Sequence, residues 1–305
     1  TQGVSSAASD VYKRQPLFVA LLGWGLFQRQ LSGKQRVWRA GWLFACQLAV
    51  NLSAPHLFEP WTPGVLSLMG LLILTETWWG QLWRRFSPPQ RTFSGLVILV
   101  LLFTTLFGTW QGPSNWEARV SSESAAEWFG HLIMTGLYPL IPWAVFAAFG
   151  MTIASLQGED HRTVLYRRVS GAGFLVSLIV LVDAIRYQKT WALPTGDASL
   201  TFFPANAPFI IAALTGTALL WWVAERTEAF TVLSDLGRVS LTVYVLHFLP
   251  MTLFQSVDET HSLSSTLTSL LVVIYTLGWM VLGSWLHRRF PHLTLEALMK
   301  RREPS

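Results

Sequence analysis

The chain has 305 residues, of which 51% are hydrophobic and only 13% are charged. This composition excludes an ordinary soluble domain, because several apolar runs approach the roughly 20 residues that a helix needs to cross a bilayer. A net charge of +5 would suggest nucleic acid in a soluble protein, but basic residues in the loops of a membrane protein set its orientation. We therefore expect an all-α fold, a polytopic bundle of transmembrane helices in a lipid bilayer, with no nucleic-acid partner.

The start of the chain differs from the remainder. Residues 1–15, TQGVSSAASDVYKRQ, are polar, lack an initiator methionine and are followed at once by Pro16 within an apolar pattern. We interpret 1–15 as read-through or a non-native leader, and we expect 16–305 to form a single integral-membrane domain.

Apolar segments follow one another along this domain, and about nine of them are long enough to count as candidate membrane crossings. The first contains Gly23-Trp24-Gly25, whose small residues predict the close approach of a neighbouring helix. The segments cover residues 16–28, 40–54, 63–81, 93–110, 131–155, 170–185, 207–224, 239–256 and 266–286.

Basic residues are divided unequally between the two sets of connections. One set contains only Arg119, Arg186 and Lys189, whereas every connection of the other set is basic. By the positive-inside rule, the basic connections and the C-terminus are cytoplasmic, so 156–169 should lie inside a bacterial inner membrane and 186–206 outside it. Nine crossings would then start outside, so we expect about ten helices in the intact protein, the first of them preceding the sequence given.

The fifth segment is apolar enough to cross a bilayer but is interrupted by Pro139 and Pro142. Proline has no N–H, so the carbonyls of residues four positions earlier lose their helical partners and must be satisfied by other protein groups. His131, Thr135 and Tyr138 share a helix face with this break. We interpret this face as the lining of a cavity, and the alternative is a kink whose polar residues pack against neighbouring helices.

The eighth segment carries a similar polar face. Ser240, Tyr244 and His247 are spaced 0, 4 and 7 along one side of the helix, with His247 near the bilayer midplane. A neutral imidazole there could accept or pass a proton, or hydrogen bond a carbonyl. We expect these three side chains to border the same cavity as the fifth segment, although an isolated core histidine would give the same pattern.

Glu76 is the carboxylate of the third apolar segment, near its cytoplasmic end. A carboxylate inside a membrane usually faces a charged partner or water. Glu76 could instead extend to the membrane interface beside Trp78, Trp79 and Arg84, and we favour this interfacial interpretation. No metal site is predicted, because Cys46 is the single cysteine and the seven histidines form no ligand pair within a helix.

Four motifs occur in an order that resembles the bacterial relatives of heparan-α-glucosaminide N-acetyltransferase, which are polytopic proteins of the membrane acyltransferase superfamily. The Phe202-Phe-Pro-Ala-Asn-Ala-Pro208 stretch before the seventh helix is similar to the helix entry of that family. The motifs are LFVALLGWGLF at 17–27, WTPGVLSLMG at 61–70, YPLIPWAVFAAFG at 138–150 and LGRVSLTVYVLH at 236–247.

This resemblance implies that acetyl-CoA is the acyl donor on the cytoplasmic side and that an amino sugar on the other side accepts the acetyl group. The Asp-x-x-Arg-Gly helix of the family and the catalytic histidine that follows it should precede Pro16, so the catalytic residue is not assigned, and residues 16–305 alone should lack activity. Cations of the inner connections could hold the phosphates of the donor. They are Lys34, Arg36, Arg39, Arg167, Arg168 and Arg238.

The leading hypothesis is therefore a transmembrane acyltransferase that moves an acetyl group from cytoplasmic acetyl-CoA to a cell-envelope or periplasmic sugar. The alternative is a multi-helix transporter with a polar site at the midplane. Transporters often contain repeated halves with paired interrupted helices, and the YPLIPW pattern has no second copy here. A structural membrane subunit is a third possibility, which the polar residues on the fifth and eighth segments make less attractive.

Overall fold

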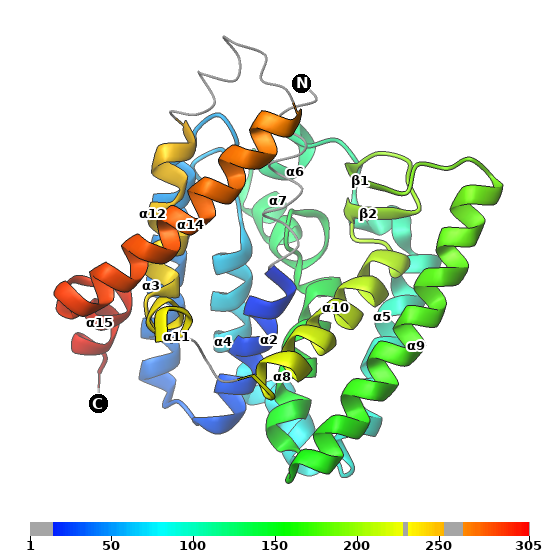
Figure 1. Cartoon of the computed structure of the whole chain (residues 1–305), viewed down its shortest axis with the longest axis horizontal. Coiled ribbons are helices and arrows are strands. Elements are labelled where there is room, and N and C mark those ends of the chain that lie inside the picture. The colour runs from blue at the N-terminus through cyan, green and yellow to red at the C-terminus, as the bar shows by residue number, and fades with distance from the viewer. Residues whose placement is uncertain (1–14, 228–230, 253–264, 305) are drawn as a thin grey trace.

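The computed structural model describes residues 15–227, 231–252 and 265–304, and within them the chain forms an all-α helical bundle (Figure 1). Residues 1–14 of the expected leader lie outside the described part, whereas Gln15 is buried as the first residue of α2. Each of the nine predicted apolar segments contains helix. The main helices are α2 (Gln15–Gln28), α3 (Gly33–Ser53), α4 (Val65–Arg85), α5 (Pro89–Leu106), α7 (Ala125–Gly130), α8 (Leu140–Ser155), α9 (Glu159–Arg186), α10 (Ala207–Ala224), α11 (Thr231–Arg238), α12 (Ser240–Leu246), α14 (Ser265–Arg289) and α15 (Leu295–Arg301).

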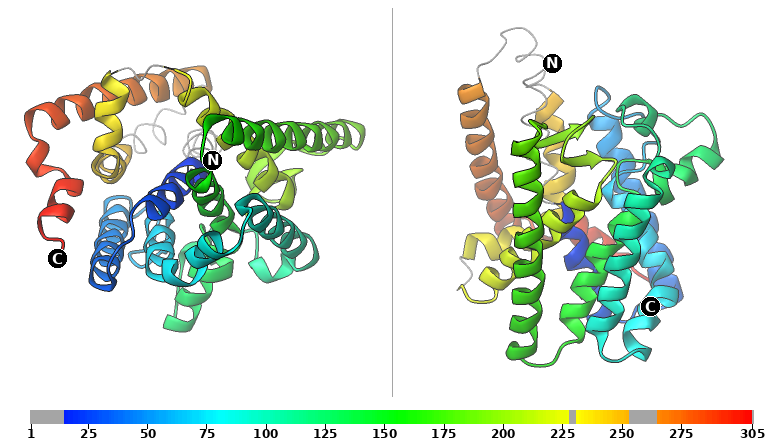
Figure 2. Two further views of the ribbon diagram at one scale, coloured as in Figure 1. Left: turned by 90° about the horizontal axis from the view of Figure 1, so that it is seen from below. Right: turned by 90° about the vertical axis from the view of Figure 1, so that its right-hand side faces the viewer.

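Five of the described helices are long and apolar enough to cross a membrane on their own: α4, α5, α9, α10 and α14. A sixth crossing is formed if the bent pair Ala125–Thr135 and Leu140–Ser155 counts as one span, and Ser240–Thr252 is a shorter apolar helix. In α9 and α14 only 11% and 6% of the apolar window is buried, and both helices lie at the periphery of the bundle (Figure 2). Their exposed apolar surface fits a lipid environment, so the chain is a multi-pass membrane protein.

The buried centre of the bundle is α8, which packs against α2, α4 and α5. Two glycines allow its contact with α2, because a Cβ atom on Gly23 would lie 1.9 Å from the Ala147 oxygen and one on Gly150 would lie 1.7 Å from the Ala20 oxygen. The predicted close approach at the Gly-Trp-Gly sequence is thus confirmed for Gly23, whereas a Cβ on Gly25 would meet nothing within 4 Å.

The structure differs from the expected segments in two places. Helix α9 begins at Glu159 rather than near 170, since exposed polar residues can continue a helix beyond the membrane and the acidic first turn favours a helix N-terminus. The predicted loop at 156–169 is therefore a short connection followed by helix. The outer connection at 186–206 contains two short parallel strands, β1 (Ala192–Thr195) and β2 (Leu200–Phe203), with Leu193 opposite Thr201.

The two ends of the bundle differ in structure (Figure 1). One end carries η1 (Gly108–Gln111), α6 (Glu117–Val120), α7 and the two strands, and the other carries α15 and the C-terminus. The basic residues of the predicted inner connections lie at helix ends away from the strands: Arg29 follows α2, Arg84 and Arg85 end α4, and Arg162 lies in the first turn of α9. The positive-inside rule predicts that this end of the bundle is cytoplasmic.

Labelling with a membrane-impermeant maleimide tests the orientation. In a chain whose Cys46 is replaced by alanine, single cysteines at the exposed positions Gln157 and Asp197 should react from opposite sides of the membrane, Gln157 from the cytoplasm. Reaction of both positions from the same side in intact cells would show that the assigned topology is wrong.

Candidate functional site

The break predicted in the fifth segment is confirmed. Helix α7 continues into a π-helical turn, η2 (His131–Thr135), and α8 begins after Pro139, which is its N-cap residue. The two halves are bent by 50°. Ile141 has non-helical angles of φ −103° and ψ 112°, so the first turn of α8 is also distorted. Carbonyl groups of η2 therefore lack helical partners inside the protein.

Arg119 supplies partners for these carbonyls. This arginine comes from α6, is only 1% exposed, and makes no ion pair with any carboxylate of the described residues. Its guanidinium instead donates hydrogen bonds to five backbone oxygens, at distances between 2.8 and 3.3 Å. The accepting carbonyls belong to Gln111, Gly112, Pro113, Thr135 and Gly136.

Burial lowers the pKa of Arg119 to about 10, which still leaves the guanidinium charged near neutrality. The cation faces the C-terminal end of η2, where helix carbonyls carry partial negative charge. The Arg119 side chain thereby satisfies the carbonyl oxygen of Thr135, which Pro139 leaves without a helical donor. It also links η1 and α6 to the broken helix. In the sequence, Arg119 was only one of the few outer cations, and no local pattern indicated that it would be buried.

His131 is satisfied on both ring nitrogens. Its Nε2 lies 2.9 Å from the carbonyl oxygen of Ser121, which can only accept, so Nε2 carries the hydrogen. The Thr135 hydroxyl can then donate to Nδ1, 2.8 Å away. Glu127 lies 3.9 Å from Nε2. The hydrogen bond to Ser121 holds the η2 turn to the segment between α6 and α7. For His131, these contacts agree with the alternative in which the polar residues pack against neighbouring elements and do not line a cavity.

Tyr138 lies in an aromatic cluster at the N-terminal end of α8. Its ring contacts Trp143 at a centroid distance of 5.0 Å and the two phenylalanines of β2, Phe202 at 5.9 Å and Phe203 at 6.1 Å. Trp143 is fully buried. The strand pair therefore covers the break in the helix with aromatic side chains.

On α12, the Tyr244 ring contacts His247 at 5.4 Å and Phe18 of α2 at 6.4 Å. The His247 ring also packs on Phe248, at 4.2 Å. The Tyr275 hydroxyl of α14 donates to the His247 carbonyl. Ser240 is half-buried at the start of the same helix.

Ring contacts connect the two predicted faces. From His247 the contacts run through Phe248, Phe58, Trp116 and Phe203 to Tyr138, with successive centroids 4.2 to 6.1 Å apart. Tyr138 and His247 thus belong to one aromatic layer, whereas Ser240, Tyr244 and His247 are half-buried. The shared cavity itself remains a prediction.

The start of α12 is held by a carboxylate from the C-terminal helix. Glu296 of α15 accepts hydrogen bonds from the N–H groups of Leu241 (2.6 Å) and Thr242 (3.2 Å) and from the Thr242 hydroxyl (2.6 Å). The Thr242 hydroxyl oxygen accepts in turn from the Leu295 N–H, at 2.8 Å. Because free N–H groups and partial positive charge occur at a helix N-terminus, this anion stabilises the helix that carries Tyr244 and His247.

The inner arginines fall into two groups. Arg36 and Arg84 bind Glu76 at 3.4 and 2.7 Å, and Arg39 binds Glu303 through two hydrogen bonds of 2.7 and 3.0 Å. Glu76 is only 3% exposed, so the interfacial interpretation is wrong: two arginines compensate the buried carboxylate.

The remaining inner arginines of the predicted donor site are exposed: Arg167 and Arg168 on α9 and Arg238 at the end of α11. Arg168 lines a cavity between α5, α9 and α10, apart from the two aromatic faces. Lys34 is exposed at the start of α3. No group of three potential ligands among the described residues could hold a metal ion.

The comparison with known proteins gives one match. A family model described as an acyltransferase domain matches residues 86–289, which include the broken helix, the α9–α10 pair, α12 and α14. No curated protein matches the chain, and no solved structure matches it.

The carbonyl cluster around Arg119 makes a quantitative prediction. Arg119→Met should lower the free energy of unfolding by on the order of 3 kcal/mol or more, because several buried acceptors lose their donor at once. Arg119→Lys should recover only part of the loss, since an ammonium has three donors on one atom. The midpoint of thermal unfolding in detergent measures the effect, with exposed Arg186→Met as the matched control. Equal midpoints for Arg119→Met and the control would contradict this role.

Proposed function

Since the chain belongs to the acyltransferase domain family, we propose that it moves an acetyl group from cytoplasmic acetyl-CoA to a sugar of the cell envelope. The single observation that carries the proposal is the family match over 86–289 on a bundle with several membrane-spanning helices. Together these make the chain a membrane acyltransferase. The donor, the acceptor and the residues in contact with them are the parts that we propose.

The reaction would join the acceptor to the acyl carbon of the thioester. An acceptor hydroxyl or amine attacks the thioester carbonyl, a C–O or C–N bond forms, and the C–S bond breaks. The acceptor proton leaves to a base, and the CoA thiolate takes up a proton. A hydrogen-bond donor near the carbonyl oxygen would stabilise the negative charge that develops there.

We assign the polar lining of this path to the face of α12 and the break before α8. Tyr244 and His247 project from a helix that Glu296 holds at its start, so their positions are fixed from outside the membrane. The Tyr244 hydroxyl could donate to the thioester oxygen, and the His247 imidazole could carry a proton. Thr135 and Tyr138 would border the outer end, with His131 holding the η2 turn. The base that accepts the acceptor proton is not assigned.

Arg167 and Arg238 are our candidates for the phosphates of CoA. Both are exposed, and neither makes an ion pair with a carboxylate of the described residues. Arg36 and Arg39 were also predicted, but their guanidinium groups bind Glu76 and Glu303. A phosphate would have to compete with those carboxylates, so we expect them to contribute less.

Binding of the donor can be measured without turnover. Acetyl-CoA should raise the midpoint of thermal unfolding of the purified protein, by an amount equivalent to about 2.7 kcal/mol at a hundred times Kd. Arg167→Gln and Arg238→Gln should each weaken binding roughly tenfold through the loss of a charge-assisted hydrogen bond. Exposed Arg91→Gln, in the first turn of α5, is the control. No stabilisation by acetyl-CoA, or equal affinities for all three variants, would contradict the donor site.

Transfer is measured in inside-out vesicles, which present the cytoplasmic face to labelled acetyl-CoA. Tyr244→Phe and His247→Ala should each reduce incorporation into envelope glycan by roughly a hundredfold, the usual size of a proton-transfer or hydrogen-bonding contribution. Leu249→Ala, at an exposed position of the same helix, should retain activity. Unchanged transfer in both test variants would remove α12 from the reaction. Uptake of the sugar without acetylation would favour the transporter alternative.

A further inference from the structure

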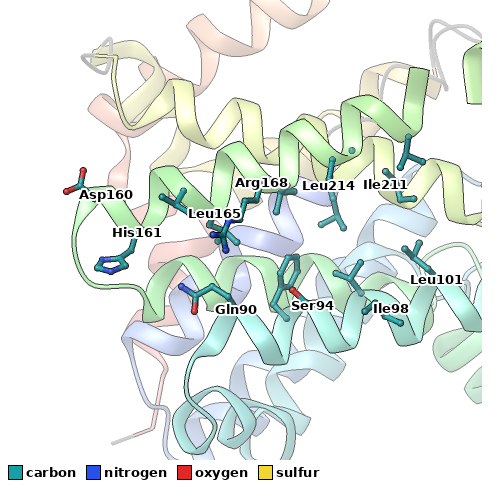
Figure 3. Close-up of a pocket in the computed structure, with 17 residues that line it drawn as sticks. Gln90, Ser94, Ile98, Leu101, Asp160, His161, Leu165, Arg168, Ile211 and Leu214 are labelled. Carbon is teal, nitrogen blue, oxygen red and sulfur yellow. The ribbon is translucent and has the colours of Figure 1, made fainter. Parts of the chain in front are cut away.

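A cavity of about 660 Å³ lies between α5, α9 and α10 (Figure 3), and neither Tyr138 nor His247 belongs to its lining. Helices α9 and α10 pack closely against each other, and α5 forms the facing wall of the cavity. The volume lies within the roughly 300–1,000 Å³ of small-molecule sites. Ile211 and Leu214 of α10 contribute to its lining.

The cavity extends along both helices by about the depth of one leaflet. On α5 it runs from Gln90 to Leu101, and on α9 it runs from Val164 to Val176, with Arg168 one turn after Val164. At 1.5 Å per residue these stretches measure about 16 and 18 Å, close to half of the ~30 Å hydrocarbon thickness. Since both stretches start at the basic ends of their helices, the cavity occupies the cytoplasmic half of the membrane under the assigned topology.

The cytoplasmic end of the cavity is polar. Arg168 and Gln90 lie on opposite walls there and point toward each other, whereas Asp160 and His161 lie nearer to the connection before α9 (Figure 3). The Gln90 Oε1 atom is buried and has no hydrogen-bond partner. Arg168 is without a carboxylate partner among the described residues. An anion that also carries a hydrogen-bond donor would satisfy both groups.

We propose that this cavity binds a phospholipid of the cytoplasmic leaflet, with one acyl chain along α5 and α9 and the phosphate at Arg168. From Arg168 to Val176 the lining measures about 12 Å along α9, within the ~15 Å of one leaflet, and Arg168 lies where the phosphate of such a lipid is found. A polar headgroup such as glycerol or ethanolamine would donate to Gln90.

This assignment also separates Arg168 from the donor site. Arg167 and Arg168 are adjacent in sequence, but only Arg168 lines the cavity. Adjacent residues on a helix point about 100° apart, so one arginine can face a lipid while the other faces the cytoplasmic solvent. The lipid site does not depend on the identity of the acyl donor or acceptor.

The test uses purified protein in nanodiscs of phosphatidylethanolamine and phosphatidylglycerol, with a trace of phosphatidylglycerol that carries a diazirine on one acyl chain. After illumination, cross-linked peptides should come from 93–101 of α5 and 169–176 of α9. Ala172→Trp fills the cavity and should reduce this labelling at least fivefold, whereas Leu178→Trp, an exposed position of α9 outside the cavity, should not. Labelling spread evenly over the lipid-exposed helices, or unaffected by Ala172→Trp, would overturn the proposal.

Two further experiments test the phosphate contact and a competing ligand. Arg168→Gln should reduce labelling by the phospholipid probe severalfold but leave labelling by a diazirine diacylglycerol, which has no phosphate, unchanged. Equal effects on both probes would overturn the phosphate contact. Palmitoyl-CoA equimolar with the probe should not displace it, and efficient displacement would assign the cavity to a long-chain acyl donor instead. Cross-links between two copies through α9 would show that a second protein chain covers it.

Discussion

The fold depends on how one buried arginine satisfies a broken membrane helix. Pro139 separates η2 from α8 and removes a helical hydrogen bond from the Thr135 carbonyl, which another protein group must then satisfy. Arg119 donates to that carbonyl, to the next one, and to three others, those of the last residue of η1 and of the two residues that follow it. The break is therefore stable without a carboxylate partner, and the outer connections are fixed against the end of α8, the helix at the centre of the bundle.

A second interruption lies between α11 and α12. There a negative charge, Glu296, binds a helix N-terminus, whereas the positive charge of Arg119 binds the C-terminal end of η2. The chain turns at Val239 between α11 and α12, which leaves the first N–H groups of α12 exposed to the interior, and Glu296 accepts from two of them. Arg39 binds Glu303 and holds the pKa of that carboxyl below its usual range, and the Trp38 indole donates to the Met299 carbonyl. The C-terminal segment thus joins α3 to α12. Charges from outside the membrane stabilise both helix breaks, in the directions that the helix dipole favours.

Sequence patterns were sufficient for the features that depend on local composition. The helices, the break before α8 and the contact at Gly23 follow from apolar run length, proline and small residues. Side-chain partners were not predictable, because Arg119 acts on carbonyls of other elements and Glu296 lies more than 50 residues from α12 along the chain. Glu76 was misplaced for a similar reason, since it binds Arg36, 40 residues earlier, in addition to the nearby Arg84. Neither proline nor periodicity indicated the aromatic layer between Tyr138 and His247.

The central claim is that the end of the broken helix and the face of α12 border one path for an acyl group. An acyl-CoA analogue with a diazirine on the acyl group tests it directly, since the label marks whatever lies beside the reacting carbon. After illumination of vesicles with the analogue on the cytoplasmic side, we expect cross-linked peptides from both 135–146 and 240–252, and excess acetyl-CoA should prevent their labelling. Cross-links confined to the α5–α9 cavity or to the inner connections, or insensitive to acetyl-CoA, would contradict the claim.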